Sequence, residues 1–448
     1  MSRVRFLAAL LASKLTAGLI RLVAKGRGTN LPGRIALKLD PEFLSHFRGI
    51  APERTIFVTG TNGKTTTVNL LYQILTEAGC SVVCNLNGAN MLTGAAVPLL
   101  KASSLTGRVR CDYLLLETDE RYVSKIGAQL PAGWLCVTNI QKDQVQRNGQ
   151  PSVILNKLRE AVRPDQTLFI NEDEPNCCSL QHAGAARVVS YAITPTAGSK
   201  AAPPSFFSVS MPCPVCHSAL QFDACNLTKV GRFHCPGCGL SSKGSADHLL
   251  QDVNLPERRF TVQGRQYTCH YNEVQFLYSY AAALAVAREL GIAPETIAAA
   301  FERFQGKSDR VQQRELLGRR FTFYKTKQEN SENLQNIVDA VTGRPGEKVL
   351  LLGLDEFVGY DPPYLDACYL FDCDYMDLQA SGVTRWSCMA NYEGNAAALA
   401  LSYSGMDPER GTVLPFDNPE AIRGFLSSAD TEVCLVEENP FWEGGTTW

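Results

Sequence analysis

Short apolar runs alternate with helical patterns from Thr55 to about Ile193. A parallel strand buried on both faces forms a continuous apolar run, whereas an amphipathic helix repeats apolar residues at i, i+3, i+4 and i+7. Their alternation is typical of a doubly wound α/β sheet that is mostly parallel, whose ligands bind at the carboxyl ends of the strands. The strand-like runs cover residues 55–58, 81–84, 112–117, 134–139, 167–171 and 188–192.

Two further changes in the pattern predict the domain organisation. Around residues 195–245, Pro, Ala and Ser precede a cysteine cluster, which we interpret as an inserted module. A smaller α/β pattern begins near Val311. The sequence therefore predicts an N-terminal segment over residues 1–50, a central domain over 51–310 with an insert at about 205–245, and a C-terminal α/β domain over 311–448.

The N-terminal segment is basic and amphipathic. Its first 39 residues contain eight Lys or Arg and no Asp or Glu. Lys14 and Arg21 interrupt the apolar runs, so the segment is too short to span a bilayer and does not resemble a signal peptide. On a helix, Lys14, Arg21 and Lys25 share one side beside a Leu/Ile/Val face. Two interpretations stay open: a helix lying on an anionic membrane surface, and a terminal helix docked on the protein's own core.

The overall composition excludes several functional classes. The 448 residues are 45% hydrophobic and carry a net charge of −2, which is typical of a soluble globular protein and argues against a nucleic-acid-coating surface. Most of the sixteen cysteines stand singly in apolar runs, as in a reducing compartment, so we expect a cytoplasmic protein that binds no nucleic acid.

A glycine-rich loop joins the first strand-like run to a helical pattern, and it has the features of a phosphate-binding loop. Glycines let backbone N–H groups point at phosphate oxygens, Lys64 supplies a cation for the β- and γ-phosphates, and the Thr65 hydroxyl can reach Mg²⁺. The general pattern has a glycine five residues before Gly63, where this chain has Val58. We predict an ATP site formed by Thr61, Asn62, Gly63, Lys64, Thr65, Thr66 and Asn139.

Polar clusters follow three successive strand-like runs. Glu117 ends one run, and we predict it as a second magnesium ligand because Mg²⁺ prefers hard oxygen ligands. Asn139 and Asp143 follow the next run, and an acidic segment at 171–175 follows another. Each alone is more often a capped turn, but three in succession are typical of an active site at the edge of a parallel sheet.

Four cysteines have the spacing of a zinc ribbon. Two Cys-x-x-Cys pairs are separated by eighteen residues, and prolines and glycines beside them favour tight turns. A shell of four thiolates leaves no open position on the metal, so we predict a structural Zn²⁺. Its ligands are Cys213, Cys216, Cys235 and Cys238, with His217 and His234 as surface neighbours.

Together these residues resemble the Mur ligase family, whose loop has the same Gly-Thr-x-Gly-Lys-Thr form. The resemblance covers nearly the whole chain and includes residues 28–33, 61–66, 117–120, 138–139, 143–144 and 171–175 and the four-cysteine ribbon. Members that add amino acids usually have Asp-His after the Thr-Asn pair and an Asp-x-x-His-Asn-Pro-like motif in the C-terminal domain. This chain has Asp143-Gln144 and, at 325–330, Lys-Thr-Lys-Gln-Glu-Asn.

These departures make the chain similar to the subunits of the family that amidate lipid II together with a GatD-type glutaminase. The resemblance implies ATP-dependent phosphorylation of the D-glutamate α-carboxylate, followed by attack of ammonia to give D-isoglutamine. No Gly-x-Cys-x-Gly elbow occurs in this chain, so glutamine hydrolysis requires the partner. The alternative is a Mur-type ligase that adds an amino acid to a peptidoglycan precursor or a folate-like acceptor.

The resemblance also implies residues in the C-terminal domain and near adenine. A C-terminal aspartate completes the partner's Cys-His pair; counting back from Phe371-Asp372 gives Asp366, with Asp361 and Asp355 as the other candidates, although this region departs from the family pattern. Ser279 stands where Mur ligases often have an asparagine near adenine. Lipid II implies that the enzyme works at the inner face of the cell membrane.

Overall fold

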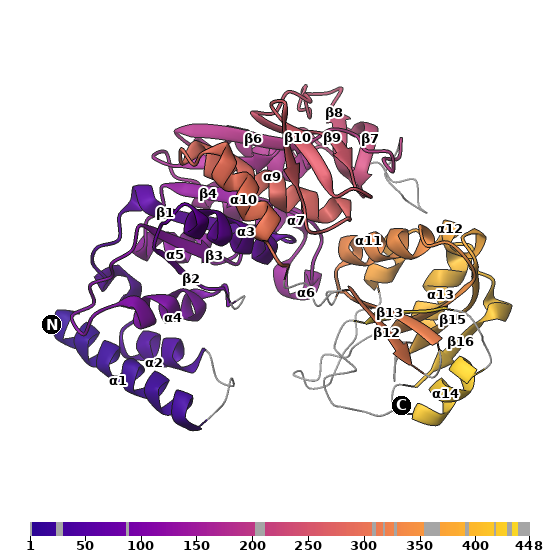
Figure 1. Cartoon of the computed structure of the whole chain (residues 1–448), viewed down its shortest axis with the longest axis horizontal. Helices are drawn as coiled ribbons and strands as arrows, with labels where there is room; N and C mark the ends of the chain where they lie inside the picture. The colour runs from indigo at the N-terminus through magenta and orange to yellow at the C-terminus, as the bar shows by residue number, and fades with distance from the viewer. Residues whose placement is uncertain are drawn as a thin grey trace. The chain divides into compact units, whose positions relative to one another are not determined.

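The structure is a computed structural model that forms two compact units (Figure 1). The first unit contains the described residues up to Gln141, then 149–201 and 211–306; the second contains residues 142–148 and the described residues from 311 onward. The described residues are 2–23, 30–86, 89–201, 211–306, 311–316, 319–326, 329–353, 368–389, 394–415, 418–427 and 432–437.

A nine-stranded sheet forms the centre of the first unit, and its six predicted strands are all present and parallel. Its order is β11 (Arg265–Thr268), β10 (Arg259–Val262), β9 (His248–Asn254), β6 (Arg187–Ile193), β5 (Thr167–Asn171), β4 (Trp134–Val137), β1 (Thr55–Thr59), β3 (Tyr113–Glu117) and β2 (Val82–Cys84). β9 continues the parallel sheet beside β6, whereas β10 pairs antiparallel with β9 and β11. This antiparallel extension was not predicted, because the apolar run near Phe260 alone does not specify its partner.

Alternate residues of the central strands belong to two hydrophobic cores, one on each face of the sheet. In β1, Ile56 and Val58 join one core and Phe57 joins the other, because successive side chains of a strand point to opposite faces. The first core includes α3 (Lys64–Glu77), α9 (Val274–Glu289) and α10 (Pro294–Arg303). The second includes α4 (Leu92–Ala102), α5 (Val123–Gln129) and α7 (Pro151–Ala161). Helix α3, which follows the predicted phosphate-binding loop, therefore belongs to one of the two helical layers that cover the sheet.

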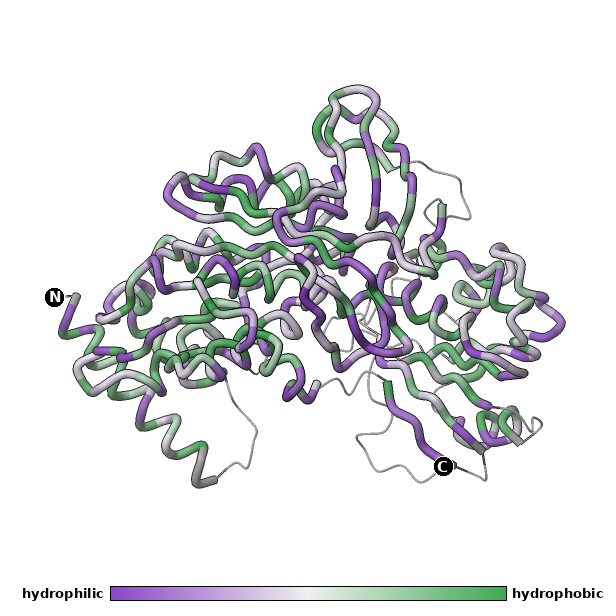
Figure 2. Tube along the Cα trace, turned by 45° about the horizontal axis from the view of Figure 1, so that its top comes forward, coloured by the Kyte–Doolittle hydropathy of each residue, from purple (hydrophilic) through white to green (hydrophobic). Residues whose placement is uncertain are grey.

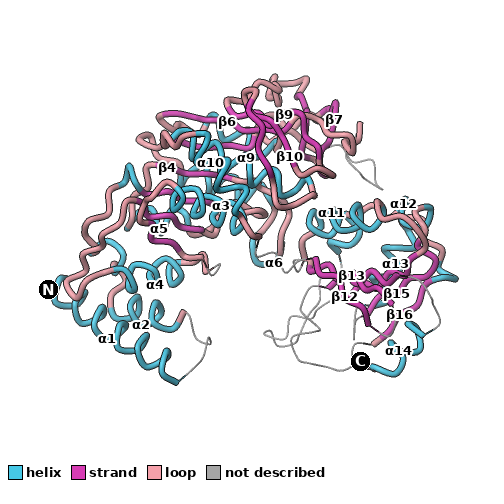
Figure 3. The backbone as a smooth tube through the Cα atoms, viewed as in Figure 1, coloured by secondary structure: helices cyan, strands magenta, loops and turns pink. Residues whose placement is uncertain are grey.

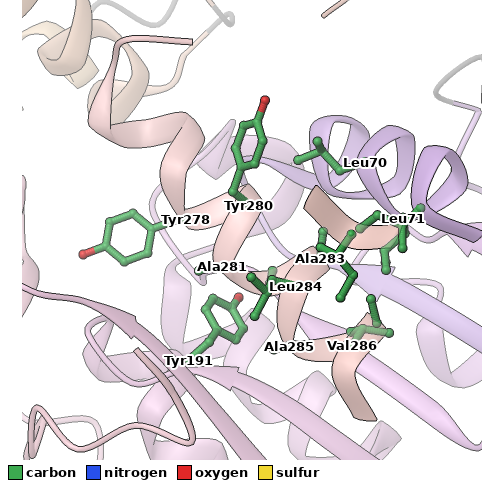
Figure 4. Packing of buried hydrophobic residues seen from close by; sticks show 14 of the residues in the cluster. Leu70, Leu71, Tyr191, Tyr278, Tyr280, Ala281, Ala283, Leu284, Ala285 and Val286 are labelled. Carbon is green, nitrogen blue, oxygen red and sulfur yellow. The ribbon is translucent and has the colours of Figure 1, made fainter. Parts of the chain in front are cut away.

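Helix α9 is buried along most of its length. Its residues from Phe276 to Ala287 are all buried, because it packs against both α3 and the strands β5 and β6. Figure 4 shows Ala283, Leu284 and Val286 of α9 beside Leu70 and Leu71 of α3. The run of alanines permits this close approach of helices, and α9 thereby supports the N-terminal turn of α3.

A helical layer precedes the sheet. It contains α1 (Ser2–Val23), α2 (Leu31–Leu39) and two 3₁₀ turns, η1 (Phe43–His46) and η2 (Pro52–Arg54). Helices α1, α2 and α4 contact one another and appear side by side in Figure 3. Phe6 of α1 packs on Phe43 and Phe47, with ring centroids 5.2 and 5.4 Å away. The N-terminal helix is thus docked on the first unit, as one of the two open interpretations requires.

The inserted module is a small hairpin with its own core. Strands β7 (Gln221–Leu227) and β8 (Val230–His234) pair antiparallel. Leu220, Phe233 and Leu240 are buried with Cys213 and Cys235 in this module, and Cys178 of the neighbouring α8 (Pro175–Cys178) joins them. So small a core is typical of a module that depends on a metal or disulfide for stability.

The second unit has its own six-stranded sheet and two cores. Hydrophobic stretches run through the interior of each unit in Figure 2. All neighbouring strands are parallel except β12 and β13. The strand order is β12 (Val311–Leu316), β13 (Arg319–Lys325), β17 (Glu432–Glu437), β14 (Lys348–Gly353), β15 (Val383–Met389) and β16 (Gly411–Leu414). The helices are α6 (Val145–Asn148), α11 (Ser331–Thr342), α12 (Met376–Ala380), α13 (Gly394–Tyr403) and α14 (Pro419–Ser427), with 3₁₀ turns η4 (Cys368–Asp372) and η5 (Pro408–Arg410).

Candidate functional site

The predicted phosphate-binding loop lies between the end of β1 and the start of α3. Gly60 has φ +124° and Gly63 has φ +82°, conformations that side chains with a Cβ disfavour. A Cβ on Gly60 would lie 2.4 Å from Thr138 Oγ1 and 2.7 Å from the Asn139 carbonyl oxygen. The residues directly after β4, the strand next to β1 in the sheet, therefore contact the loop closely, and only glycine fits at this position.

Hydrogen bonds from the end of β4 hold the loop in place. The Asn62 N–H donates to Asn139 Oδ1 at 2.8 Å, and Asn139 Nδ2 donates to the Asn62 carbonyl at 3.0 Å. The Thr138 hydroxyl donates to the same carbonyl at 2.6 Å. Asn62 Nδ2 also donates to Gln141 Oε1 at 2.9 Å. The structure thus brings Asn139 to Asn62, and both were predicted as ATP-site residues.

Lys64 is the first residue of α3, and its side chain folds back across the loop. It is buried, and Nζ donates to the carbonyl oxygens of Gly60 and Thr61 and contacts Glu120 Oε2 at 3.3 Å. Thr65, next along α3, is exposed. The ammonium group therefore lies at a helix N-terminus, where the helix dipole and backbone N–H groups both favour an anion.

The acidic residues after β3 have different environments. Glu117 is buried; its backbone N–H donates to Asn85 Oδ1 at 2.8 Å, and Asn90 Nδ2 lies 3.5 Å from its Oε1. Asp119 accepts two hydrogen bonds from the Arg121 guanidinium at 2.9 Å. Burial raises the pKa of Asp119, but the bonds from Arg121 outweigh burial and hold the pKa below its usual value. Asp119 is therefore bound to Arg121, and Glu117 and Glu120 are the better candidates for a role at the phosphate-binding loop.

Sequence reasoning did not assign a role to Glu120, and it placed Ser279 near adenine. The structure places Glu120 beside Lys64 and brings the Ser279 hydroxyl to 3.4 Å from the Gly63 carbonyl, where α9 packs on α3. Neither contact has a signal in the sequence, because each joins segments far apart along the chain. The Glu120 carboxylate thus contacts the Lys64 ammonium group, and the Ser279 hydroxyl contacts the loop backbone at Gly63.

In the acidic segment after β5, Glu172 binds the inserted module, whereas Glu174 binds α8 and the backbone N–H of Ile140, the residue after Asn139. Glu172 Oε1 accepts from the backbone N–H groups of Lys243 and Gly244 at 2.7 and 3.1 Å. Glu174 Oε1 and Oε2 cap α8 by accepting from the N–H groups of Asn176 and Cys177 at 3.0 and 2.8 Å. These carboxylates satisfy backbone donors, as carboxylates at helix N-termini commonly do.

Asp173, between them, is fully buried beneath the module. Its Oδ1 accepts from Ser242 at 2.8 Å, and its Oδ2 accepts from the Tyr278 hydroxyl and the Ile193 N–H, both at 2.9 Å. Burial raises the pKa of Asp173 to about 6 despite these three hydrogen bonds. Figure 4 shows the Tyr278 hydroxyl directed away from the leucines of α3. One carboxyl group thus links the sheet, α9 and the module.

Asp143 lies in the second unit. Its Oδ1 accepts from Asn330 Nδ2 at 3.0 Å, and the Asn330 side chain also caps α11. Gln144 donates its N–H to the Glu329 carbonyl at 3.1 Å, and Lys142 pairs with Asp372. The pairing of Asp143 with the segment that replaces the C-terminal family motif could not be read from the sequence. Asp355, Asp361 and Asp366 lie outside the described residues.

The four predicted zinc ligands lie together at one end of the β7–β8 hairpin. Their sulfur atoms all lie within 4.8 Å of one another, with Cys213 and Cys238 sulfurs 3.6 Å apart and Cys216 and Cys235 sulfurs 3.4 Å apart. A disulfide has sulfurs about 2.05 Å apart, whereas a tetrahedral shell with Zn–S near 2.3 Å places them roughly 3.8 Å apart. The cluster therefore fits a tetrahedral metal and not a disulfide pair.

Comparisons with a family model and with solved structures indicate the class of protein. The Mur ligase middle domain family matches residues 58–233. Among solved structures, a pseudomurein peptide ligase type C from Methanothermus fervidus is similar with a TM-score of 0.67 and 18% identity, covering 89% of this chain and 78% of that chain. MurF from Acinetobacter baumannii is similar with a TM-score of 0.62 and 14% identity, covering 92% and 79%. The chain has the Mur ligase fold, as predicted.

Within this class, the curated relatives are MurT proteins. A lipid II isoglutaminyl synthase (glutamine-hydrolyzing) subunit MurT from Streptococcus pneumoniae is 30% identical over 305 residues, which are 67% of this chain and 64% of the relative. The subunit of the same name from Staphylococcus aureus strain COL is 26% identical over 377 residues, which are 82% and 80%. The chain is thus similar to MurT proteins and has the Mur ligase fold, and the match spans just under two thirds of the length of the pneumococcal relative.

Proposed function

We propose that this protein is the ATP-dependent synthetase subunit of a lipid II amidotransferase. It phosphorylates the α-carboxylate of the D-glutamate residue in the lipid II stem peptide, and ammonia then displaces the phosphate to give D-isoglutamine. The observation that carries the proposal is the loop between β1 and α3, where Lys64 lies at a helix N-terminus within a backbone that only glycine permits at Gly60. The names of the MurT relatives supply the substrate class.

The site residues fit the phosphates of ATP. Thr61, Asn62, Gly63 and Thr66 flank Lys64 in the loop and the first turn of α3. A Thermotoga maritima MurF of the same fold was solved in complex with ADP, with a TM-score of 0.54 and 16% identity. Thr65, exposed on α3, and Glu117 are the proposed magnesium ligands. Bound Mg²⁺ supplies charge neutralisation to the transferring phosphoryl group.

The chemical reason for the ATP requirement is the poor reactivity of a carboxylate. Its negative charge repels a nucleophile, and oxide is a poor leaving group. Transfer of the γ-phosphoryl group to a carboxylate oxygen gives an acyl phosphate and ADP. Attack of ammonia on the acyl carbon forms the C–N bond, breaks the C–O bond to phosphate and releases a proton. Lys64 and the N–H groups of the loop stabilise the negative charge of the transferring group.

Ammonia as the nitrogen source is favoured over an amino acid by the segment around Asp143. Amino-acid-adding Mur ligases have Asp-His there, whereas this chain has Asp143-Gln144, with Asp143 bonded to Asn330. We propose that a GatD-type glutaminase supplies the ammonia, since the MurT relatives are named as subunits of a glutamine-hydrolysing enzyme. We propose that Asp366, or else Asp361 or Asp355, serves that partner's catalytic histidine, and that the ribbon cysteines hold a structural Zn²⁺.

Reconstitution tests the proposal. The purified protein is incubated with lipid II in detergent micelles, ATP, Mg²⁺ and ammonium chloride, and in parallel with a GatD-type glutaminase and glutamine. We expect amidated lipid II by mass spectrometry in both reactions, and none with glutamine when the partner is omitted. ADP release that depends on a free amino acid and needs no partner would instead support the amino-acid ligase. Absence of both products from folded, ATP-binding protein would reject the proposal.

A further inference from the structure

Helix α1 presents an apolar stripe to solvent along its whole described length. Val4, Leu11, Leu15 and Leu19 are 75%, 45%, 69% and 61% exposed. With Ala8, which is also exposed, they recur at i, i+4, i+7, i+11 and i+15, the spacing that keeps residues on one face of a helix. Clusters of exposed leucines on one face are uncommon in soluble proteins and mark interaction surfaces.

The opposite face of α1 is the one that docks on the protein. Phe6, Ala9, Leu10 and Ser13 are buried there against α2, α4 and η1. Lys14 is also turned toward the first unit, where Nζ donates to the carbonyls of Leu100 and Ser103 at 2.6 and 2.7 Å. The buried face of α1 thus packs on α2, α4 and η1, and the leucine stripe on its other face stays exposed. The two interpretations of the N-terminal segment are therefore compatible.

Exposed cations border the stripe. Arg3 and Arg5 of α1 and Arg34 and Lys38 of the adjacent α2 are all exposed. The first acidic residue in the chain is Asp40, which is buried and lies 3.2 Å from His46 Nδ1 and 3.8 Å from Arg5 Nε. This surface therefore combines apolar side chains with excess positive charge and little opposing charge.

We propose that the exposed face of α1, flanked by α2, binds the surface of an anionic lipid bilayer, with the leucines in the acyl–headgroup boundary and the arginines and lysines at lipid phosphates. A rigid amphipathic helix with a basic border is the structure that lies in such an interface. Among the described residues, no helix has the length and apolar character to cross a bilayer. A second copy of the chain is a poorer occupant, because two surfaces of the same positive charge repel each other.

Co-sedimentation with lipid vesicles tests this interface. The full chain is mixed with vesicles of phosphatidylcholine containing phosphatidylglycerol, and with vesicles of phosphatidylcholine alone. The variant Leu11→Glu/Leu15→Glu/Leu19→Glu removes the stripe at exposed positions. Its matched control is Val153→Glu/Met376→Glu/Leu399→Glu, which makes the same charge change at exposed apolar residues on other helices. We expect binding to anionic vesicles to fall by roughly 10-fold or more in the α1 variant only.

A second pair of variants tests the cations. Arg34→Gln/Lys38→Gln is compared with Lys125→Gln/Lys157→Gln, which removes two exposed cations away from α1 and α2. We expect the first variant to lose about 10-fold in binding to anionic vesicles and the second to retain it. Circular dichroism and ATP binding report on folding and on the nucleotide site, so a failure here is distinguishable from a failure of the proposed function.

Three results would overturn the proposal. The first is a wild-type chain that sediments with neither type of vesicle. The second is an equal loss of binding in a test variant and its control. The third is a wild-type dimer, detected by light scattering, that becomes a monomer when the leucines of α1 are replaced; that outcome would assign the stripe to a second copy of the chain.

Discussion

At the scale of single residues, we propose that nucleotide binding depends on Lys64. Replacement by alanine removes a cation from a helix N-terminus, where a charge-assisted contact to phosphate contributes about 1.5–3 kcal/mol. We therefore predict that Lys64→Ala weakens ATP binding by about 10- to 100-fold in isothermal calorimetry, while Lys157→Ala, at an exposed position on α7, leaves it unchanged. Equal affinities for the two variants would contradict this role.

Asp173 makes stability depend on pH. Its pKa is about 6 in the folded protein because of burial, against about 3.9 in an unfolded chain. The folded state therefore binds the proton more tightly, so this contribution to stability is full below about pH 4 and is lost as the pH rises through 6. A shift of about two pKa units corresponds to roughly 3 kcal/mol.

We predict that the free energy of unfolding of the wild type, relative to Asp173→Asn, falls by about 2 kcal/mol between pH 4 and pH 7. The asparagine variant does not titrate, so the other titrating groups cancel in the difference. Chemical denaturation at several pH values measures this quantity. A difference that stays constant over the range would show that Asp173 does not titrate there.

Some residue roles could be predicted from the sequence and others could not. The loop and the four cysteines were recognisable because their spacing along the chain sets their geometry. The contacts of Glu120 with Lys64 and of Ser279 with Gly63 join segments that are distant in sequence. The sequence does not distinguish a carboxylate that caps a helix from one that binds a ligand, so the contacts of the acidic residues at 172–174 could not be predicted.

At the scale of elements, the β1–loop–α3 unit depends on Gly60. A Cβ there would collide with Thr138 and Asn139, and φ of +124° is strained for any other residue. We predict that Gly60→Ala destabilises the first unit by about 2 kcal/mol or more and weakens ATP binding. Gly79→Ala has positive φ but nothing within 4 Å, so it should cost only about 1 kcal/mol and spare ATP binding. Equal effects in thermal unfolding and calorimetry would contradict the close contact with β4.

The ribbon element should depend on its metal. We predict about one zinc per chain, and its loss in Cys238→Ser together with rapid proteolysis between β7 and β8. Cys368→Ser is the matched control, because Cys368 is also exposed and lies outside the cluster. Inductively coupled plasma mass spectrometry measures the metal. Wild-type protein without zinc, or a variant that retains it, would show that the cysteines have another role.

Element prediction succeeded where local pattern and tertiary packing agree. The six parallel strands were predicted because strands buried on both faces leave continuous apolar runs. A strand-like apolar run near Phe260 corresponds to β10, but its antiparallel pairing with β9 and β11 was not predicted, because pairing partners depend on the sheet and not on the run itself. Helix α1 showed both a core-facing and an exposed apolar face, so periodicity alone left its surroundings open.

At the scale of the whole molecule, the chain contains two α/β units, and we propose that a glutaminase completes the enzyme. Because no nucleophile elbow occurs in the sequence, we predict that the proposed synthetase uses free ammonia alone and glutamine only with its partner. The second unit contains the described residues from 311 onward and also residues 142–148, which the sequence pattern did not separate from the central domain.

Transfer of oxygen from the substrate carboxylate to phosphate tests whether amidation proceeds through an acyl phosphate. Lipid II labelled with ¹⁸O in the D-glutamate α-carboxylate is incubated with the protein, ATP, Mg²⁺ and ammonium chloride, and the released phosphate is analysed by mass spectrometry. An acyl-phosphate route requires one labelled oxygen in phosphate for each amide formed. Amide that forms while the phosphate stays unlabelled would contradict activation of the carboxylate at the Lys64 loop.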